Sequence, residues 1–201
     1  MKDFFLEKAF NFDNSSRRIN NASKVALEII KEINLKKEME ILDFGAGTGL
    51  LLERIAPFVK KITAVDKSPS MVKVLNEKIQ AKKIACEVEI LELDFENSEI
   101  KKKFDGIISS MTMHHIQDIS KLFDKSYQLL NENGFIALAD LEEEDGSFHD
   151  SDTGVFHFGF KKEDILEVAK SAGFRELKIK RVNVIQKPQG NFGVFLLTGK
   201  K

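Results

Sequence analysis

A glycine-rich segment that follows an apolar run is the feature that most restricts how this chain can fold. Residues 39–44 are mostly apolar, Gly45, Gly47 and Gly49 follow at alternate positions, and residues 50–55 have the composition of a helix. A strand that runs through such a loop into a helix brings bare backbone close to a bound ligand. A glycine-rich turn can also be a plain tight connection between a strand and a helix that binds no ligand. The segment therefore indicates a nucleotide-like site only in combination with residues elsewhere in the chain.

The spacing of these glycines separates two classes of nucleotide site. Dinucleotide-binding enzymes use the pattern Gly-x-Gly-x-x-Gly, in which the last glycine lets the helix pack closely on the strand. In this chain Leu50 occupies that last position. The loop therefore disfavours a nicotinamide-dependent oxidoreductase, which remains an alternative enzyme class.

The rest of the chain alternates short apolar runs with amphipathic stretches. The predicted strands are residues 39–44, 61–65, 88–93, 104–109, 135–139, 174–182 and 192–198, and the predicted helices are 19–33, 50–55, 69–79, 119–130 and 161–172. Strands that alternate with helices indicate crossovers and parallel pairing, whereas two consecutive final strands indicate an antiparallel addition at one edge. We expect an α/β fold, a Rossmann-like three-layer sandwich with a mostly parallel seven-stranded sheet and an antiparallel last strand.

Acidic residues stand where three of these predicted strands end. Asp43, Asp66 and Asp94 follow the first, second and third strands, and Ser110 and Asp140 follow the fourth and fifth. Ligands of such sheets bind outside the carboxyl ends of the strands. Each acid alone has a simpler interpretation, since Asp66 can cap a helix and Asp94 can sit in an ordinary loop. The three together, at the ends of successive strands, predict a ligand site at this edge of the sheet.

On these residues the chain resembles the class I S-adenosylmethionine-dependent methyltransferases, and the resemblance extends over most of its length. Their first motif is an acidic residue, one residue and then Gly-x-Gly-x-Gly, which reads Asp43-Phe44-Gly45-Ala46-Gly47-Thr48-Gly49 here. Val65-Asp66 and Leu93-Asp94-Phe95 match the second and third acidic positions, and Met113-His114-His115-Ile116 is similar to the ubiquinone/menaquinone-type small-molecule enzymes. At residues 129–134 the family usually has a Pro-Gly-Gly turn, which Asn133-Gly134 matches only loosely.

The resemblance implies S-adenosylmethionine as the cofactor, with S-adenosylhomocysteine as the product. It implies that Asp66 binds the ribose hydroxyls, that Asp94 and the Phe95 amide bind adenine, and that Asp43 balances the ammonium group. The N-terminal arm commonly closes over the cofactor in this family. The full implied cofactor set is Asp43, Phe44, Gly45, Ala46, Gly47, Thr48, Gly49, Asp66, Lys67, Met71, Asp94, Phe95, Ser110, Met111, His115 and Phe12.

Methyl transfer requires alignment of the reacting atoms, and a neutral nucleophile must also lose a proton. His149 and His115 are the candidate catalytic bases, because both follow predicted strands at the edge where the cofactor is expected. His115 can instead be a helix-start residue packed near the cofactor, and His149 can be a solvated loop residue. His157 lies between two phenylalanines, which is typical of a half-buried histidine with a backbone partner.

The composition argues against several partners. Cys86 is the only cysteine, and no His-x-x-x-His or Glu-x-x-His pair is present, so no metal site is predicted. The acidic run 142–145 is expected to be solvated and not to form a set of metal ligands. The 31 basic and 32 acidic residues give a net charge of −1, without the basic excess of a nucleic-acid binder. Without a signal core or a membrane-length apolar run, a cytoplasmic protein without a membrane partner is expected.

These patterns combine into one functional prediction. Residues 1–201 form a single methyltransferase domain, in which residues 1–35 are an N-terminal arm and helix that can cover the cofactor, and residues 1–15 are a loose aromatic arm. The enzyme is expected to move a methyl group to an oxygen, nitrogen or carbon nucleophile of a small molecule, as a monomer or homodimer. A protein or tRNA acceptor and a non-catalytic adenosine-binding protein are the further alternatives.

Overall fold

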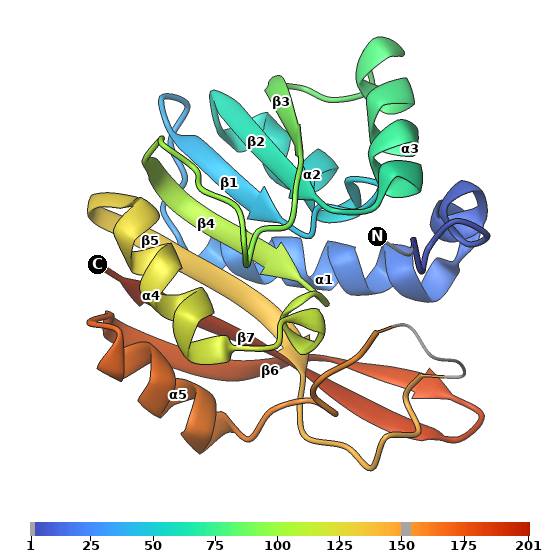
Figure 1. Cartoon of the computed structure of the whole chain (residues 1–201), viewed down its shortest axis with the longest axis vertical. Helices are drawn as coiled ribbons and strands as arrows, with labels where there is room; N and C mark the ends of the chain where they lie inside the picture. Colours follow the sequence, from blue (N-terminus) through green and yellow to red (C-terminus); the bar gives the residue numbers. More distant parts are fainter. Residues whose placement is uncertain (1–2, 150–153) are drawn as a thin grey trace.

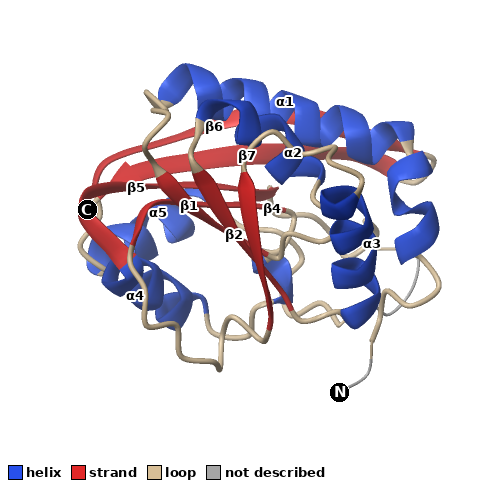
Figure 2. Cartoon of the chain, turned by 90° about the horizontal axis from the view of Figure 1, so that it is seen from above, coloured by secondary structure: helices blue, strands red, loops and turns tan. Residues whose placement is uncertain are grey.

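The alternation of strands and helices builds a seven-stranded sheet with helices on both faces (Figures 1 and 2). The computed structural model describes residues 3–149 and 154–201. The strands are β1 (Glu40–Phe44), β2 (Lys61–Asp66), β3 (Glu87–Glu92), β4 (Phe104–Ser110), β5 (Leu130–Leu141), β6 (Arg175–Lys187) and β7 (Gly190–Lys200). The helices are α1 (Ser16–Glu32), α2 (Leu50–Ile55), α3 (Pro69–Gln80), α4 (Ile119–Leu129), α5 (Lys162–Ser171) and the 3-10 turns η1 (Ala9–Asn14), η2 (Ala56–Phe58) and η3 (Met113–His115). No helix in the described ranges is both long and apolar enough to cross a membrane.

The strand order is β3-β2-β1-β4-β5-β7-β6. The strands β1 to β5 pair in parallel, whereas β7 runs antiparallel to both of its neighbours, β5 and β6. This confirms the predicted Rossmann-like, mostly parallel sheet with an antiparallel last strand. The last strand is not the outermost one, because β7 lies between β5 and β6 and leaves β6 at the edge.

Two apolar cores lie on opposite faces of the sheet, because successive side chains of a strand point in opposite directions. On β1, Ile41 belongs to the core beneath α1, α2 and α3, whereas Leu42 belongs to the core beneath α4 and α5. Figure 2 shows these two helical layers on either side of the strands. Because both faces are covered, the central strands are almost wholly apolar, and their polar side chains gather at the strand ends.

The fifth strand begins earlier than its sequence indicates. The predicted strand starts at Phe135, but β5 starts at Leu130, which pairs with Phe104 of β4. The register then shifts, and Asn133 adopts a left-handed conformation with φ of 63°. The predicted Asn133-Gly134 turn is therefore an irregularity within the strand. Asparagine tolerates this backbone region better than most residues.

Residues 3–15 are more ordered than the loose arm that the sequence predicts. Residues 9–14 form η1, and Asp3 fastens the segment before it to the start of α3. The Asp3 carboxylate accepts hydrogen bonds from the Ser68 hydroxyl at 2.8 Å and from the Ser70 amide at 3.2 Å. These contacts lie far apart in sequence, so the apolar pattern of the arm could not reveal them.

Candidate functional site

A cavity of about 520 Å³ opens at the carboxyl ends of β1, β2 and β4, beneath the N-terminal arm. It is lined by all of the cofactor residues implied by the resemblance except Gly49, and by the candidate bases His115 and His149. Gly49 instead precedes α2 with a φ of 87°. The topology thus brings together residues spread from Phe12 to His149, as expected for strand ends that share one edge.

The three glycines of the loop perform different tasks. All have positive φ, at 65°, 56° and 87° for Gly45, Gly47 and Gly49, which side chains rarely adopt. A Cβ on Gly45 would lie 2.2 Å from the Thr112 side chain, and one on Gly49 would lie 2.7 Å from Leu75. A Cβ on Gly47 would meet no atom within 4 Å, although Gly47 lines the cavity. Gly45 and Gly49 therefore allow the loop to pack closely against Thr112 and Leu75, whereas Gly47 leaves space free in the cavity.

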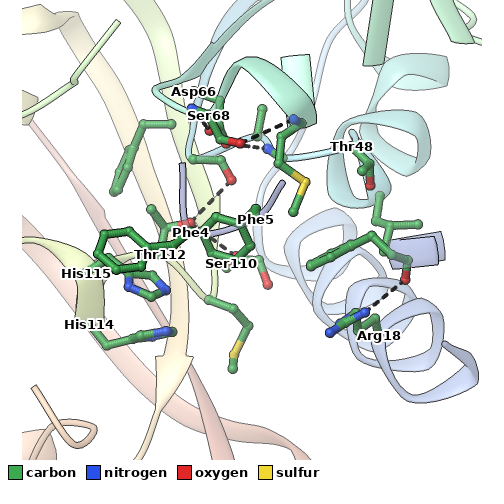
Figure 3. A pocket seen from close by; sticks show the side chains of 18 of the residues that line it. Phe4, Phe5, Arg18, Thr48, Asp66, Ser68, Ser110, Thr112, His114 and His115 are labelled. Atoms are coloured by element: carbon green, nitrogen blue, oxygen red, sulfur yellow. Dashed lines mark hydrogen bonds between the residues drawn. The ribbon is translucent and has the colours of Figure 1, made fainter. Parts of the chain in front are cut away.

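Asp66 joins the loop to the second strand. Its carboxylate accepts hydrogen bonds from the Gly47 amide at 2.7 Å and from the Ser68 amide at 2.9 Å (Figure 3). Burial raises the pKa of Asp66, and these two amide bonds oppose that rise. Both bonds leave further lone pairs of the carboxylate available to a ligand with hydroxyl donors.

Asp43 carries a buried carboxylate oxygen without a partner. The side chain is 1% exposed, and its Oδ2 has no hydrogen-bond partner among the described residues. Burial chiefly, and the nearby Asp66 carboxylate, raise the pKa of Asp43 well above its ordinary range. An unpartnered buried acid is costly, and a cationic group in the cavity would remove that cost. The Asp43 carboxylate on this wall therefore fits a ligand with an ammonium group.

Asp94 and Phe95, which follow β3, also line the cavity. The Asp94 carboxylate accepts hydrogen bonds from the Glu96 amide at 2.9 Å and from the Asn97 side chain at 3.0 Å. The buried Phe95 ring stacks on Phe44, with the ring centroids 4.8 Å apart and 11° between the planes. Asp94 thus organises its own turn while it also lines the cavity.

The segment after β4 supplies a wall of the cavity beside the glycine loop, where the Thr112 hydroxyl donates to the Gly45 carbonyl. Ser110 ends β4, and Met111 follows with a φ of 62°, a backbone region that costs an unbranched residue about 1 kcal/mol. The Met111 amide donates to the Ala139 carbonyl at 2.9 Å, which holds the turn. Strained residues of this kind concentrate at ligand sites.

Residues of the N-terminal segment line the cavity, among them Phe4 and Phe5 (Figure 3). The Phe5 ring meets His115 edge to face, with centroids 5.9 Å apart. The Arg18 guanidinium lies 4.0 Å from the centre of the Phe12 ring. The Thr48 hydroxyl of the glycine loop donates to Asp13 at 2.6 Å. Phe5 thus contacts the histidines, and Asp13 of η1 contacts the glycine loop.

Three histidine rings meet in the cavity. The His114 and His115 centroids are 4.2 Å apart, and His149 lies 5.1 Å from His114 and 6.0 Å from His115. Burial first, and then the charge of His114, lower the pKa of His115 to about 4; the same causes lower that of His149 to about 4. Both therefore stay neutral at neutral pH. His157 lies outside this group, and its Nε2 is 2.9 Å from the Ile116 carbonyl.

The His114–Asp140 pair was missed by the sequence reasoning. Nδ1 of His114 lies 2.6 Å from Oδ1 of Asp140, and the two side chains are 2% and 0% exposed. Burial acts to raise the pKa of Asp140, but His114 and the amides of His114 and Leu141 hold it below its ordinary value. Asp140 was recognised as a strand-end acid, yet nothing in the sequence connects it with a histidine 26 positions earlier.

The acidic run 142–145 forms ion pairs and turns. Glu142 pairs with Arg181 and Lys162, and the Glu144 carboxylate accepts hydrogen bonds from the amides of Gly146 and Phe148. Among residues 3–149 and 154–201, no group of three or more His, Cys, Asp or Glu side chains is arranged to hold a metal ion.

The sheet order and the loop after β1 define the class I S-adenosylmethionine-dependent methyltransferase fold. Residues 16–177 match the sequence model of a methyltransferase domain, so the chain belongs to this methyltransferase family. An uncharacterized methyltransferase of Schizosaccharomyces pombe is 34% identical over 79% of this chain and 60% of that protein. A malonyl-[acyl-carrier protein] O-methyltransferase of Acetivibrio thermocellus is 29% identical over 67% of this chain and 47% of that protein. The chain thus spans about half of the length of these relatives.

Solved structures share the fold at low sequence identity. A chain from the complex between the Haloferax volcanii Trm112 methyltransferase activator and a methyltransferase superposes with a TM-score of 0.82 and 14% identity, covering 100% of this chain and 98% of that chain. Phosphoethanolamine N-methyltransferase 2 of Haemonchus contortus, in complex with S-adenosyl-L-methionine, gives a TM-score of 0.73 and 18% identity over 100% of this chain and 60% of that chain. These similarities establish the fold.

Proposed function

We propose that the protein is an S-adenosylmethionine-dependent methyltransferase that acts on an oxygen, nitrogen or carbon nucleophile of a small molecule. The observation that carries the proposal is the buried, unpartnered Asp43 carboxylate oxygen, which lies at the cavity beside the open space at Gly47. S-adenosylmethionine offers a positive ammonium group, a ribose diol without phosphate and an adenine ring, which suit acids at three strand ends. The bound sulfonium supplies an activated methyl group.

Each strand end has a proposed part in holding the cofactor. Asp43 balances the ammonium group, Asp66 accepts from the ribose hydroxyls, and Asp94 and the Phe95 amide bind adenine. Residues 1–35, as an arm and helix of the same domain, cover the bound molecule and exclude water. The contact of Phe5 with His115 supports this role, since it bridges the arm to the far wall of the cavity.

Calorimetric titration with S-adenosylmethionine and S-adenosylhomocysteine tests the proposal. Both are expected to bind at one site per chain, whereas NADH is expected not to bind. Folded protein that binds neither adenosyl compound would refute the proposal. Tight NADH binding would instead support the oxidoreductase alternative, which the spacing at Leu50 disfavours.

Asp66→Ala is expected to weaken S-adenosylmethionine binding by about 1–3 kcal/mol, because charge-assisted hydrogen bonds to the ribose are lost. Calorimetry on the purified variant measures the change. Asp118→Ala is the matched control, since Asp118 caps α4 through the Lys121 amide and does not line this cavity. An unchanged dissociation constant for Asp66→Ala would remove that residue from the ribose role.

Binding of S-adenosylmethionine is expected to release a proton from Asp43. The apoprotein raises the pKa of Asp43 above 3.8, and a bound ammonium group would lower it again. Affinity should therefore rise with pH above 3.8, up to the raised pKa. Calorimetry at about pH 6, in two buffers of different ionisation enthalpy, counts the released protons. Equal proton release by Asp43→Asn and the parent protein would contradict this assignment.

The proposed acceptor is a small molecule. The cavity volume of about 520 Å³ lies in the range of small-molecule sites, and the arm restricts access to it. The relative from Acetivibrio thermocellus is by its name an O-methyltransferase of malonyl-[acyl-carrier protein], which supports an oxygen acceptor on a small acyl group. A panel of phenols, amines and carboxylic acids, assayed by release of S-adenosylhomocysteine, tests this proposal. Methylation of tRNA or protein alone would overturn it.

A further inference from the structure

We infer that His114, held by Asp140, takes the proton from the methyl acceptor. The sequence predicts this role for His115 or His149. The acceptor class that this predicts is a group that carries a proton at neutral pH, such as a phenol, an amine or an acidic carbon. The inference rests on the proposed function and adds to it the acceptor chemistry and the residue that serves it.

The geometry of the pair fixes the direction of its hydrogen bond. Asp140 is wholly buried, which acts to raise its pKa, but His114 and the amides of His114 and Leu141 hold that pKa below its ordinary value, so Asp140 is an ionised acceptor. Nδ1 of His114, at 2.6 Å, must therefore donate the proton in that bond. The neutral ring then carries its lone pair on Nε2, the nitrogen that can accept a proton. His114 also lines the cavity (Figure 3).

The two neighbouring rings are poor proton acceptors. The pKa values of His115 and His149 fall to about 4, which leaves both neutral and weakly basic. In both cases the charge of His114 is a main cause of the fall, after burial. Three rings within 6.0 Å of one another cannot all be charged in a buried site. His114 has a carboxylate oxygen of Asp140 at 2.6 Å from its Nδ1, which can stabilise a positive charge on the ring.

The charged groups around the pair favour this assignment. Asp140 lies on β5, and His115 lies on η3 beside His114. His149 lies on the segment after β5, where Lys187 of β6 and Lys8 of the arm also lower its pKa. Asp140 accepts hydrogen bonds from the ring and the amide of His114, and it also accepts one from the Leu141 amide.

The proposed step balances without any further reactant. The bond between the acceptor atom and its hydrogen breaks, and the proton goes to Nε2 of His114. The electron pair left on the acceptor atom forms the new bond to the methyl carbon, and the pair of the broken carbon–sulfur bond stays on sulfur. Asp140 stabilises the resulting imidazolium, which later returns its proton to water.

Histidine NMR in the complex with S-adenosylhomocysteine tests the electrostatic part without an acceptor. The neutral His114 ring is expected to carry its proton on Nδ1, toward Asp140, and its lone pair on Nε2. In Asp140→Asn, which keeps the size of the side chain, this tautomer is expected to be less populated, because the anionic acceptor is lost. A proton on Nε2 of the neutral His114 ring in the parent protein, or the same tautomer population in the variant, would overturn the inference.

Turnover of three probes tests the catalytic part. With catechol or benzylamine, His114→Asn is expected to lower the release of S-adenosylhomocysteine about 100-fold, and Asp140→Asn is expected to move the acid limb of the pH–rate profile to lower pH. The control is His157→Gln, a histidine outside the cavity, which should leave turnover and profile unchanged. Benzoate is already ionised and needs no base. Turnover of benzoate but of neither catechol nor benzylamine would overturn the inference. Turnover of catechol or benzylamine that persists in His114→Asn would also overturn it.

These outcomes are separable from failure of the proposed function. Absence of adenosyl-compound binding would refute the methyltransferase proposal before any histidine is examined. Normal binding with the proton of the neutral His114 ring on Nε2 would refute only the role of His114. A merely structural His114–Asp140 pair would change stability in both variants but would not move the acid limb of the profile.

Discussion

Gly47→Ala is expected to weaken S-adenosylmethionine binding about tenfold to a hundredfold while the protein stays folded. The new Cβ would meet no protein atom within 4 Å, so it would project into the space that the ligand is proposed to occupy. The cost of overlap with a bound molecule is about 1–3 kcal/mol, as in an overpacked core. The positive φ of 56° adds a penalty of about 1 kcal/mol to folding.

Gly45→Ala is the matched variant, two residues away in the same loop. Its Cβ would lie 2.2 Å from both branches of the Thr112 side chain and 2.7 Å from its Cβ, so rotation of Thr112 cannot relieve the overlap. We expect a loss of about 3 kcal/mol or more in the free energy of unfolding. Denaturant unfolding and calorimetry on both variants separate the two effects. If both variants lost the same unfolding free energy, or if Gly47→Ala bound S-adenosylmethionine as well as the parent protein, the roles of Gly45 in packing and of Gly47 in ligand space would be contradicted.

Acidification from about pH 7 to pH 4 is expected to cost the protein about 3 kcal/mol of unfolding free energy through His115. Its pKa is about 4 in the folded protein against 6.5 for the free side chain. Between these values the unfolded chain binds a proton that the folded chain does not, so stability falls as the pH falls. This contribution is fully present above pH 6.5 and is lost as the pH approaches 4. The half-buried His149 adds a smaller loss in the same direction, because solvent screens it.

Denaturant unfolding of the parent protein and of His115→Gln over this pH range measures the effect. Carboxylates also titrate there, so the informative quantity is the difference between the two slopes. The variant should lose stability less steeply on acidification, although it is less stable at neutral pH because packing against Phe5 and His114 changes. His157→Gln serves again as the control outside the cluster. Parallel slopes for the parent and His115→Gln would contradict the buried, neutral state of His115.

The fold could be predicted because its patterns are local. Each predicted strand appears in the sheet, and α2 begins at Leu50, directly after the last glycine, as expected. The limits of β5 could not be predicted, since the pairing of Leu130 with Phe104 depends on a register shift between two strands. The position of β7 between β5 and β6 follows from pairing over long range, which apolar periodicity does not encode.

The cavity wall was predictable where it consists of strand ends. Asp43 and Asp66 lie there because the carboxyl ends of parallel strands meet at one edge. The pairing of His114 with Asp140 was not predictable, because it requires η3 to approach the end of β5 in space. The same holds for Asp3, whose partners Ser68 and Ser70 begin a helix 65 or more residues away. The roles of the cavity residues toward a ligand remain predictions.

The internal position of β7 also has a consequence for protein synthesis. Since β7 leaves the ribosome after β6, both β6 and the free side of β5 lack their partner until residues 190–200 have emerged. Up to that point the nascent chain carries two extended segments with unsatisfied backbone groups, a state open to pairing with other chains. The long separation of β5 from β7 also slows their pairing. Completion of the sheet is thus a late event, and translation that stops before Gly190 leaves a product prone to aggregation.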